Sequence, residues 1–403
     1  MSRFLFYIFV VYLKLVYAKS GFLDNAATAN ADFTPCSQNT STATLRIVLV
    51  IDTSTNMGST NLRQIGLSLS SELSEYTISN KTLDTVCADT YCWNASNSVS
   101  YNSNVAIVTY SDTYTLVGDF SDFASNADVN SALLSLKPSS SNSVNGLIGA
   151  LKLAYNLSDV SDPVPFKKSL AVLWFPASVK NLTLFEVAIG GRTAMYREEL
   201  VAVNYNPNDR NLTNMLNQLE IPYIFNKTQP NIYDNIHWAL LQLNCHCGFN
   251  VEFQPKVYNK KINQWEKTAD CFIFKVTKED TKFCQNHPEI AIDSDVKFSA
   301  MQEAGHAYNI TSVILGLHKN NKNQWMWYDY NGGEFQMNNF TKWAPNQPSS
   351  GDCVIAKTLD NQETTPYLWY TMPCNLTHSN TDTCQVLACD ASRQWFCGLG
   401  RYY

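Results

Sequence analysis

Three nearly unbroken apolar segments dominate the first half of the chain. They are residues 45–52 (LRIVLVID), 169–175 (SLAVLWF) and 199–205 (ELVAVNY). A strand that is apolar at consecutive positions must be covered on both faces, which is typical of the central strands of a parallel sheet between helices. This feature restricts the first half of the chain to a small set of α/β folds.

Segments with helical spacing separate these strands. The positions that share one helix face are Leu62, Ile65, Leu69 and Leu73, and the same spacing recurs in residues 146–157, 211–219 and 231–243. Further strands are expected at residues 104–110, 114–120 and 223–225. This alternation predicts a doubly wound, Rossmann-like α/β domain over residues 45–243, with a mainly parallel sheet.

The beginning of the chain and its cysteines point to the secretory pathway. The chain has 403 residues and 12 cysteines, which is too many for an ordinary cytosolic protein. Residues 1–18 hold a basic start, an apolar run and a small-residue end, as in a secretory signal peptide. Lys14 ends the apolar run too early for a membrane span. We expect residues 19–44 to begin a secreted, extracellular chain without a transmembrane segment.

Acceptor sites for N-linked glycans agree with this compartment. The Asn-x-Ser/Thr sequences start at Asn39, Asn80, Asn94, Asn156, Asn181, Asn211, Asn226, Asn309, Asn339 and Asn375. Chance matches are the alternative for each, because the chain is rich in these residue types.

Charge and motifs argue against two broad functions. The chain carries 29 Lys and Arg against 35 Asp and Glu, a net charge of −6, and no basic run that could neutralise phosphates, so we expect no nucleic-acid partner. The sequence contains no G-x-S-x-G, H-E-x-x-H or P-loop motif, and its six histidines are scattered. We therefore expect no catalytic residues and no enzyme activity.

The turn after the first apolar segment reads Asp52-Thr-Ser54-Thr-Asn56. Ligands of open α/β sheets bind at the carboxyl ends of the strands, and a carboxylate followed by hydroxyl groups can present several oxygens to Mg²⁺. The strand and this turn resemble a von Willebrand factor type A domain, whose metal-dependent adhesion site uses Asp-x-Ser-x-Ser. The resemblance covers about residues 45–243.

This sequence departs from the pattern of that adhesion site. The third motif position is Asn56, which could still offer an oxygen, and Ser141 stands near the place of a family Thr. The strand at 169–175 is followed by Pro176-Ala-Ser178, where the family has a second Asp. The resemblance thus implies a degenerate site of Asp52, Ser54, Asn56 and Ser141. We expect no resident cofactor and at most weak binding of Mg²⁺ or Ca²⁺.

Cysteine and tryptophan motifs dominate residues 245–403. Ile314-Leu-Gly-Leu, Trp325-Met-Trp-Tyr-Asp, Gly351-Asp-Cys353-Val and Leu368-Trp369-Tyr-Thr-Met-Pro-Cys374 follow in that order. Together they resemble a C-type lectin-like domain, which predicts a mixed α+β, disulfide-stapled fold. The resemblance implies Cys284–Cys397 and Cys353–Cys374 disulfides, and Cys271 paired with Cys245 or Cys247. In a secreted chain, Cys245-His-Cys247 favours disulfides over zinc.

Sugar binding in the lectin family uses calcium, which is held by a Glu-Pro-Asn or Gln-Pro-Asp triplet and a Trp-Asn-Asp triplet. Here the triplets are Gln347-Pro-Ser349 and Trp369-Tyr-Thr371, which lack the carboxylates. The candidate ligand-binding residues are Gln347, Ser349, Trp369 and Trp343. Aromatic residues could stack on a sugar or anchor a protein, although core packing is the usual role of such residues.

The order of the two domains resembles that of secreted C-type lectin-like proteins of nematodes. The resemblance implies an extracellular recognition protein for glycan or protein ligands, associated with innate immune defence, here without calcium-dependent sugar coordination. The alternative is a matrix or structural interaction protein with degenerate metal sites. The ligand and the oligomeric state are not encoded in any recognisable motif.

Overall fold

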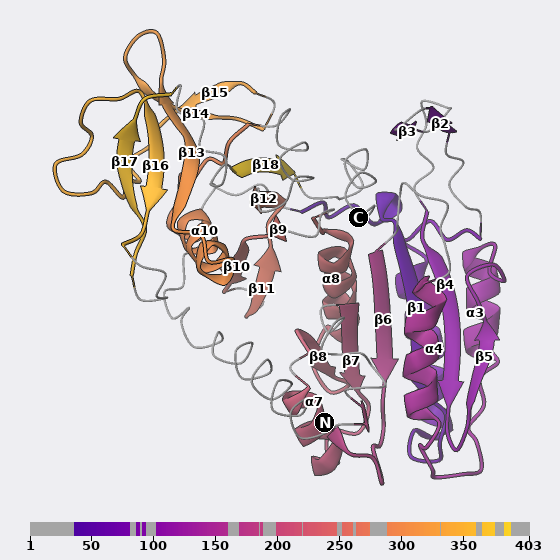
Figure 1. The fold of residues 1–403 in the computed structure, drawn as a ribbon. Coiled ribbons are helices and arrows are strands. Elements are labelled where there is room, and N and C mark those ends of the chain that lie inside the picture. Colours follow the sequence, from indigo (N-terminus) through magenta and orange to yellow (C-terminus); the bar gives the residue numbers. More distant parts are fainter. Residues whose placement is uncertain are drawn as a thin grey trace, which may run out of the picture.

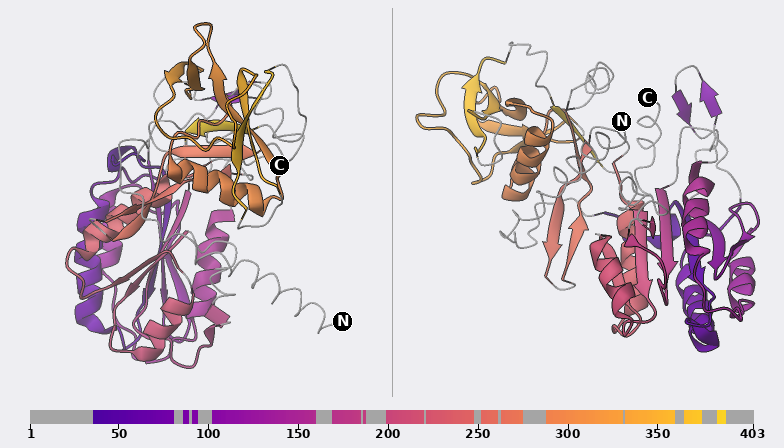
Figure 2. Two further views of the ribbon diagram at one scale, coloured as in Figure 1. Left: turned by 90° about the vertical axis from the view of Figure 1, so that its left-hand side faces the viewer. Right: turned by 60° about the horizontal axis from the view of Figure 1, so that its bottom comes forward.

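The computed structural model describes residues 36–80, 86–88, 91–93, 102–159, 169–184, 186–187, 199–219, 221–247, 252–260, 263–274, 288–330, 332–359, 365–374 and 383–387. They build an α/β module and a smaller β-rich module that lies beside it (Figures 1 and 2). The expected signal peptide lies outside the described residues.

A six-stranded sheet forms the centre of the first module (Figure 1). In spatial order its strands are β5 (Tyr114–Gly118), β4 (Asn104–Tyr110), β1 (Leu45–Asp52), β6 (Ser169–Phe175), β7 (Leu200–Asn204) and β8 (Tyr223–Asn226). All neighbouring pairs are parallel except β4 and β5. The predicted doubly wound sheet, mainly parallel, is therefore confirmed.

Helices cover both faces of this sheet, as the apolar strands require. The helices are α2 (Gly58–Leu73), α3 (Asn126–Leu134) and α8 (Ile232–Asn244) on one face, and α4 (Leu147–Asp159) and α7 (Arg210–Gln218) on the other. Along β1, Leu49 packs on the first face and Val50 on the second. Alternate residues of one strand thus join two cores, because side chains of a strand point to opposite faces.

The second module contains two further sheets and one long helix. The larger sheet has the order β15 (Glu334–Gln336), β14 (Trp325–Tyr328), β13 (Ser312–Lys319), β16 (Cys353–Lys357) and β17 (Leu368–Met372). The smaller sheet has the order β18 (Thr383–Leu387), β12 (Asp270–Phe274) and β9 (Glu252–Phe253). Helix α10 (Asp295–Ala307) begins at Ser294, whose side chain caps the backbone N–H of Lys297.

Three short elements complete the described fold. They are the 3₁₀ turn η1 (Thr40–Thr42), the hairpin β2 (Val86–Ala88) and β3 (Tyr91–Trp93), and the hairpin β10 (Lys256–Asn259) and β11 (Gln264–Lys267). No helix among the described residues is long and apolar enough to cross a membrane.

Disulfides link distant parts of the chain. Cys353 is joined to Cys374 and Cys247 to Cys271, which agrees with the pairs that the lectin resemblance implies. Cys284 and Cys397 lie outside the described residues. Cys36 is joined to Cys245, so a disulfide also ties the segment before β1 to the end of α8. The α/β module is therefore stapled as well, which the sequence did not lead us to expect.

The hairpin of β10 and β11 connects the two modules. The backbone N–H of Lys267 donates to Gln242 Oε1 at 2.7 Å, and Trp238 Nε1 donates to Glu266 Oε1 at 3.1 Å. Gln242 and Trp238 both belong to α8. The last helix of the α/β module thus holds the hairpin by side-chain hydrogen bonds, close to the Cys36–Cys245 disulfide.

Candidate functional site

Asp52 lies at the carboxyl end of β1, where a ligand site of an α/β sheet is expected. Its side chain is fully buried. Oδ1 accepts the backbone N–H of Ser54 at 2.7 Å, and Oδ2 accepts the backbone N–H of Ala177 at 3.1 Å. The loop after β6, which lacks a carboxylate, therefore supplies a main-chain donor to the carboxylate of Asp52.

Burial dominates the electrostatics of this carboxylate. It raises the pKa of Asp52 above its ordinary value, although the hydrogen bonds from Ser54 and the 177–178 backbone act in the opposite direction. Burial also raises the pKa of Tyr110 well above its ordinary value, and the Asp52 charge adds to that shift. Asp52 is thus held by neutral partners rather than by a positive charge.

The Asn56 carboxamide bridges two loops at the same strand ends. Its Nδ2 lies 3.0 Å from Ser54 Oγ and donates to the carbonyl oxygen of Asn142 at 2.9 Å. A carbonyl oxygen can only accept, so the nitrogen of Asn56 must face Asn142. The expectation that Asn56 would offer its oxygen to a cation is corrected: its donor end points toward the other candidate ligands.

Ser141 belongs to the loop that Asn56 reaches, as the resemblance implied. The carbonyl oxygen of Ser141 accepts the N–H of Thr55 at 2.8 Å, while its Oγ accepts the N–H of Ser143 at 3.0 Å. Ser139 N–H donates to the carbonyl of Thr53 at 2.6 Å. The structure thus brings the loop of residues 53–56 and the loop of residues 139–142 together through main-chain hydrogen bonds and the Asn56 amide.

These residues do not fit a divalent cation. Mg²⁺ and Ca²⁺ prefer oxygen ligands, several of them charged. Here Asp52 is the one carboxylate of the candidate set. The Nδ2 group of Asn56 lies against Ser54 Oγ, where a cation would have to bind. Within the described part of the chain, no group of three or more His, Cys, Asp or Glu could hold a metal ion, so a cation here would depend on one carboxylate and on neutral oxygens.

The candidate ligand residues of the second module also meet in space. Gln347 Oε1 accepts the N–H and the hydroxyl of Thr371 at 3.0 and 2.9 Å, and those of Ser349 at 3.2 Å each. The two hydroxyl oxygens lie 2.8 Å apart. Four donor groups thus lie around one neutral oxygen, and one of the two hydroxyl groups donates to the other hydroxyl instead. The set contains no carboxylate, and Asp352 instead lies 3.4 Å from Lys319 Nζ.

Two tryptophans were expected to contact a ligand. Trp369 is fully buried, with Trp327 and Phe340 at centroid distances of 5.7 Å, so its expected role is corrected to core packing. Trp343 is half-buried and packs against Trp369 and Trp325 at 5.6 and 5.4 Å. Only part of the Trp343 side chain is available to a partner.

Most glycan acceptor candidates within the described residues are exposed. The exposed ones are Asn39, Asn80, Asn156, Asn181, Asn211, Asn309 and Asn339, whereas Asn226 is half-buried. Asn94 and Asn375 lie outside the described residues. Exposure is compatible with modification and does not establish it.

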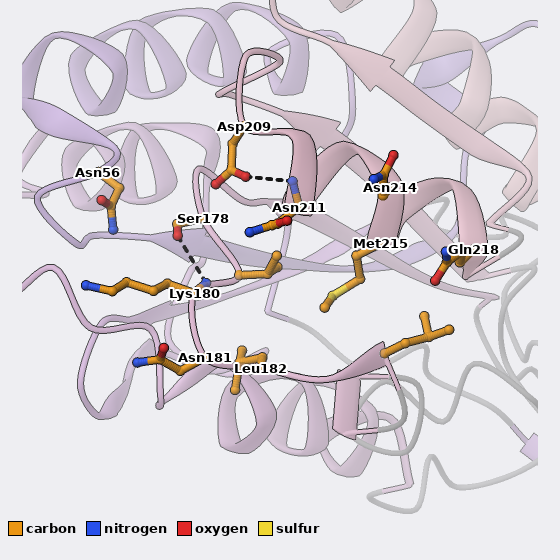
Figure 3. Close-up of a pocket in the computed structure, with 12 residues that line it drawn as sticks. Asn56, Ser178, Lys180, Asn181, Leu182, Asp209, Asn211, Asn214, Met215 and Gln218 are labelled. Carbon is orange, nitrogen blue, oxygen red and sulfur yellow. Dashed lines mark hydrogen bonds between the residues drawn. The ribbon is translucent and has the colours of Figure 1, made fainter.

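A pocket of about 550 Å³ opens beside Asn56, between the loop after β6 and helix α7 (Figure 3). Its lining residues are Asn56, Ser178, Val179, Lys180, Asn181, Leu182, Leu184, Asp209, Asn211, Asn214, Met215 and Gln218. Sequence reasoning missed this pocket, because its walls come from two segments about 30 residues apart. The available signal was the amide-rich face of residues 211–218, which a helix presents on one side.

Comparisons with known proteins identify a family for part of the first module. Residues 47–163 match the family model of the von Willebrand factor type A domain. No curated protein sequence matches the chain.

Several solved structures are similar to about half of this chain. Proximal thread matrix protein 1 from the mussel byssus is 16% identical, over 50% of this chain and 46% of the mussel chain, with a TM-score of 0.34. The von Willebrand domain of the pilus tip protein Mfa5 from Porphyromonas gingivalis is 14% identical, over 48% and 94%, with a TM-score of 0.34. The manganese-loaded TRAP protein of Plasmodium vivax is 12% identical, over 49% and 73%, with a TM-score of 0.35.

The chain therefore spans less than half the length of the mussel protein. Another structure of that mussel protein carries zinc in its adhesion motif, a property of that protein. The family match and the fold together support a von Willebrand factor type A domain at residues 47–163.

Proposed function

We propose that the protein is a secreted extracellular recognition protein that binds glycan or protein ligands without coordinating a cation. Von Willebrand factor type A domains mediate protein–protein or ligand interactions and metal-dependent adhesion. The disulfides fit an extracellular setting. The proposal is a binding protein and not an enzyme, in line with the lack of catalytic motifs in the sequence.

One observation carries the cation-free part of this proposal. In each module, a neutral carboxamide lies among the residues that would have to bind a metal ion. Asn56 donates from its nitrogen to Asn142, and Gln347 accepts at its oxygen from Thr371 and Ser349. A cation at either site would have to displace these hydrogen bonds before it could bind the same oxygens.

We propose further that the second module is a C-type lectin-like domain of the nematode type, and that the protein acts in innate immune defence. Support comes from the Cys353–Cys374 disulfide, which joins the end of β17 to β16, and from the order of the motifs. Gln347, Ser349 and Thr371 occupy neighbouring positions, as ligands of one site would. The partner in this proposal is an extracellular glycan or protein.

The alternative is a structural protein of the extracellular matrix. The junction between the modules favours it, because Cys36 and Cys245 pack in one buried cluster with Cys271 and Ile273, and α8 is hydrogen-bonded to the β10–β11 hairpin. A rigid connection of this kind suits a spacer that transmits force. In that case the exposed surfaces would hold other matrix proteins, and free glycans would not bind.

A glycan array and an array of extracellular matrix proteins, each probed with the mature chain with and without EDTA, would test the proposal. Binding that survives EDTA is the expected result. Binding that EDTA abolishes would contradict the cation-free mode. Binding to matrix proteins alone would favour the structural alternative, and no binding on either array would contradict the recognition role.

A further inference from the structure

The pocket between the loop after β6 and α7 contains one charge that has no partner. Lys180 is exposed, and its ammonium group makes no ion pair or hydrogen bond with any residue that the structure describes. Figure 3 shows the Lys180 side chain reaching toward the end of the pocket where Asn56 and Asn181 lie. An ammonium in this position attracts an anionic group.

The other charged residue of the pocket is already engaged. Asp209 precedes α7, and its Oδ1 accepts the backbone N–H groups of Asn211 and Leu212 at 2.9 and 3.2 Å. These contacts and the positive end of the helix dipole stabilise its negative charge. The two charges of the pocket cancel formally, and Lys180 is the cationic group that is left free to bind an anionic ligand.

Carboxamides provide most of the remaining polar lining. Asn181, Asn211, Asn214 and Gln218 are exposed, and their side-chain amides form no hydrogen bond within the described part of the chain. The last three lie on one face of α7, at spacings of three and four residues. Each carboxamide offers a donor and an acceptor, and a sugar hydroxyl needs both.

An apolar wall faces these polar groups. Val179 and Met215 are largely buried, and Leu182 and Leu184 are half-buried beside them. A pyranose ring has apolar C–H faces as well as hydroxyl groups, so it suits a pocket of mixed character. A volume of about 550 Å³ lies within the ~300–1,000 Å³ range of small-ligand sites.

We propose that this pocket binds a sugar that carries a carboxylate, either a uronic acid or a sialic acid. Lys180 binds the carboxylate, and Asn181, Asn211, Asn214 and Gln218 bind hydroxyl groups. The inference rests on the proposed recognition function and specifies its ligand class. It also places a sugar site in the α/β module, away from Gln347 and the second module.

The test uses the full chain made in a bacterial periplasm, which forms disulfides and adds no N-glycans. Unglycosylated protein is required because Asn181 and Asn211 are acceptor candidates, and a glycan on either would cover the pocket. Titration calorimetry with a glucuronic acid-containing tetrasaccharide and with sialyllactose distinguishes the two sources of the carboxylate. Lactose serves as the neutral control sugar.

Lys180→Gln is expected to weaken binding of the acidic sugar about tenfold or more, because it removes a charge-assisted hydrogen bond. Asn214→Asp keeps the side-chain shape and adds a negative charge, so it should weaken the same binding. Lys322→Gln changes an exposed lysine of the second module and should leave the dissociation constant unchanged. The variants should keep the wild-type circular dichroism spectrum.

Binding of one acidic sugar, with no lactose binding and weaker binding by Lys180→Gln, would support the site. It would also show whether the carboxylate belongs to a uronic acid or to a sialic acid. The proposal is overturned if neither acidic sugar binds, if lactose binds equally well, or if Lys180→Gln binds like wild type. Binding on the glycan or matrix array that survives in Lys180→Gln would retain the recognition function and reject this site alone.

Discussion

The two modules satisfy their candidate cation-binding residues with the same functional group in opposite orientations. In the α/β module the neighbours of Asn56, Ser54 Oγ and the carbonyl of Asn142, can accept hydrogen bonds, so the amide nitrogen faces them. In the second module the neighbours of Gln347 are donors, so its amide oxygen faces them. The donor end of Asn56 thus occupies acceptor oxygens that a cation would need, whereas the acceptor end of Gln347 orders the donors around it.

The modules also differ in what holds them together. The sheet of the first module lies between two extensive apolar cores, whereas the second module combines one smaller core with disulfides. The Cys36–Cys245 disulfide closes the whole α/β module and spans a sequence separation of 209 residues. Both modules therefore combine an apolar core with disulfides, and they differ in the relative contribution of each.

Removal of the long-range disulfide should have the largest effect. In the chain-entropy model, the Cys36→Ser, Cys245→Ser double variant loses about 5 kcal/mol of unfolding free energy, because the closed loop is long. The Cys353→Ser, Cys374→Ser variant, with a separation of 21 residues, should lose about 3 kcal/mol. Urea denaturation measures both. A larger loss of unfolding free energy in the second variant would show that the second module depends more strongly on its disulfide than the α/β module does.

Truncation of the buried tryptophan should come next. Trp369→Ala removes a fully buried ring from the core of the second module and should cost about 3–5 kcal/mol. Trp343→Ala removes a half-buried ring and should cost clearly less. Near-ultraviolet circular dichroism and urea denaturation measure the difference. Equal costs would contradict the assignment of Trp369 to the core.

Loss of the bridging amide should have a smaller effect. Asn56→Ala leaves Ser54 and the Asn142 carbonyl without that donor and should cost about 1 kcal/mol. Asn56→Asp brings an acceptor against the Asn142 carbonyl and should cost more than the alanine variant. Thermal unfolding of the two variants tests the orientation of the amide. A stable Asn56→Asp variant would indicate that the oxygen faces Asn142.

The smallest predicted effect concerns pH and His237, which lies 3.7 Å from Glu72 and 3.5 Å from Glu75. The interaction with Glu72 and the charges of Glu75 and Asp234 raise the pKa of His237 above 6.5, while partial burial acts in the opposite direction. The protonated pair stabilises the fold fully below pH 6.5, and this contribution is lost as the pH rises through the higher folded-state pKa.

For such a partly exposed pair the effect should be below about 1 kcal/mol. His237→Gln should remove this pH dependence of the unfolding free energy. Urea denaturation of the wild type and of His237→Gln from pH 5.5 to 8.5 measures this pH dependence. The same slope in both proteins would assign the pH dependence to other groups.

The strands were predictable because their apolar runs depend on local sequence. Residues 104–110 and 169–175 are strands over the predicted ranges, and the predicted helices differ by a few residues at their ends. Helix α3 was missed because Val129 and Leu133 are its only buried residues, which is too weak a periodic pattern to recognise. Local signals thus gave the framework of the α/β module.

The candidate sites were predictable only in part. Sequence motifs placed Asp52, Ser54 and Asn56 in one turn, but the orientation of the Asn56 amide depends on Asn142, which is 86 residues away. The donor from Ala177 and the contact between Gln347 and Thr371 are likewise long-range. Such contacts depend on tertiary packing, and residue type alone does not determine them.

The central claim is that both modules satisfy their candidate sites without a cation. The most direct measurement is the thermal unfolding of the full chain in EDTA and in millimolar Mg²⁺, Mn²⁺ or Ca²⁺. A cation at about 100 times its dissociation constant stabilises the folded state by about 2.7 kcal/mol, which shifts the melting temperature by degrees. We predict the same melting temperature in every condition. A rise that depends on cation concentration and is reversed by EDTA would contradict the account.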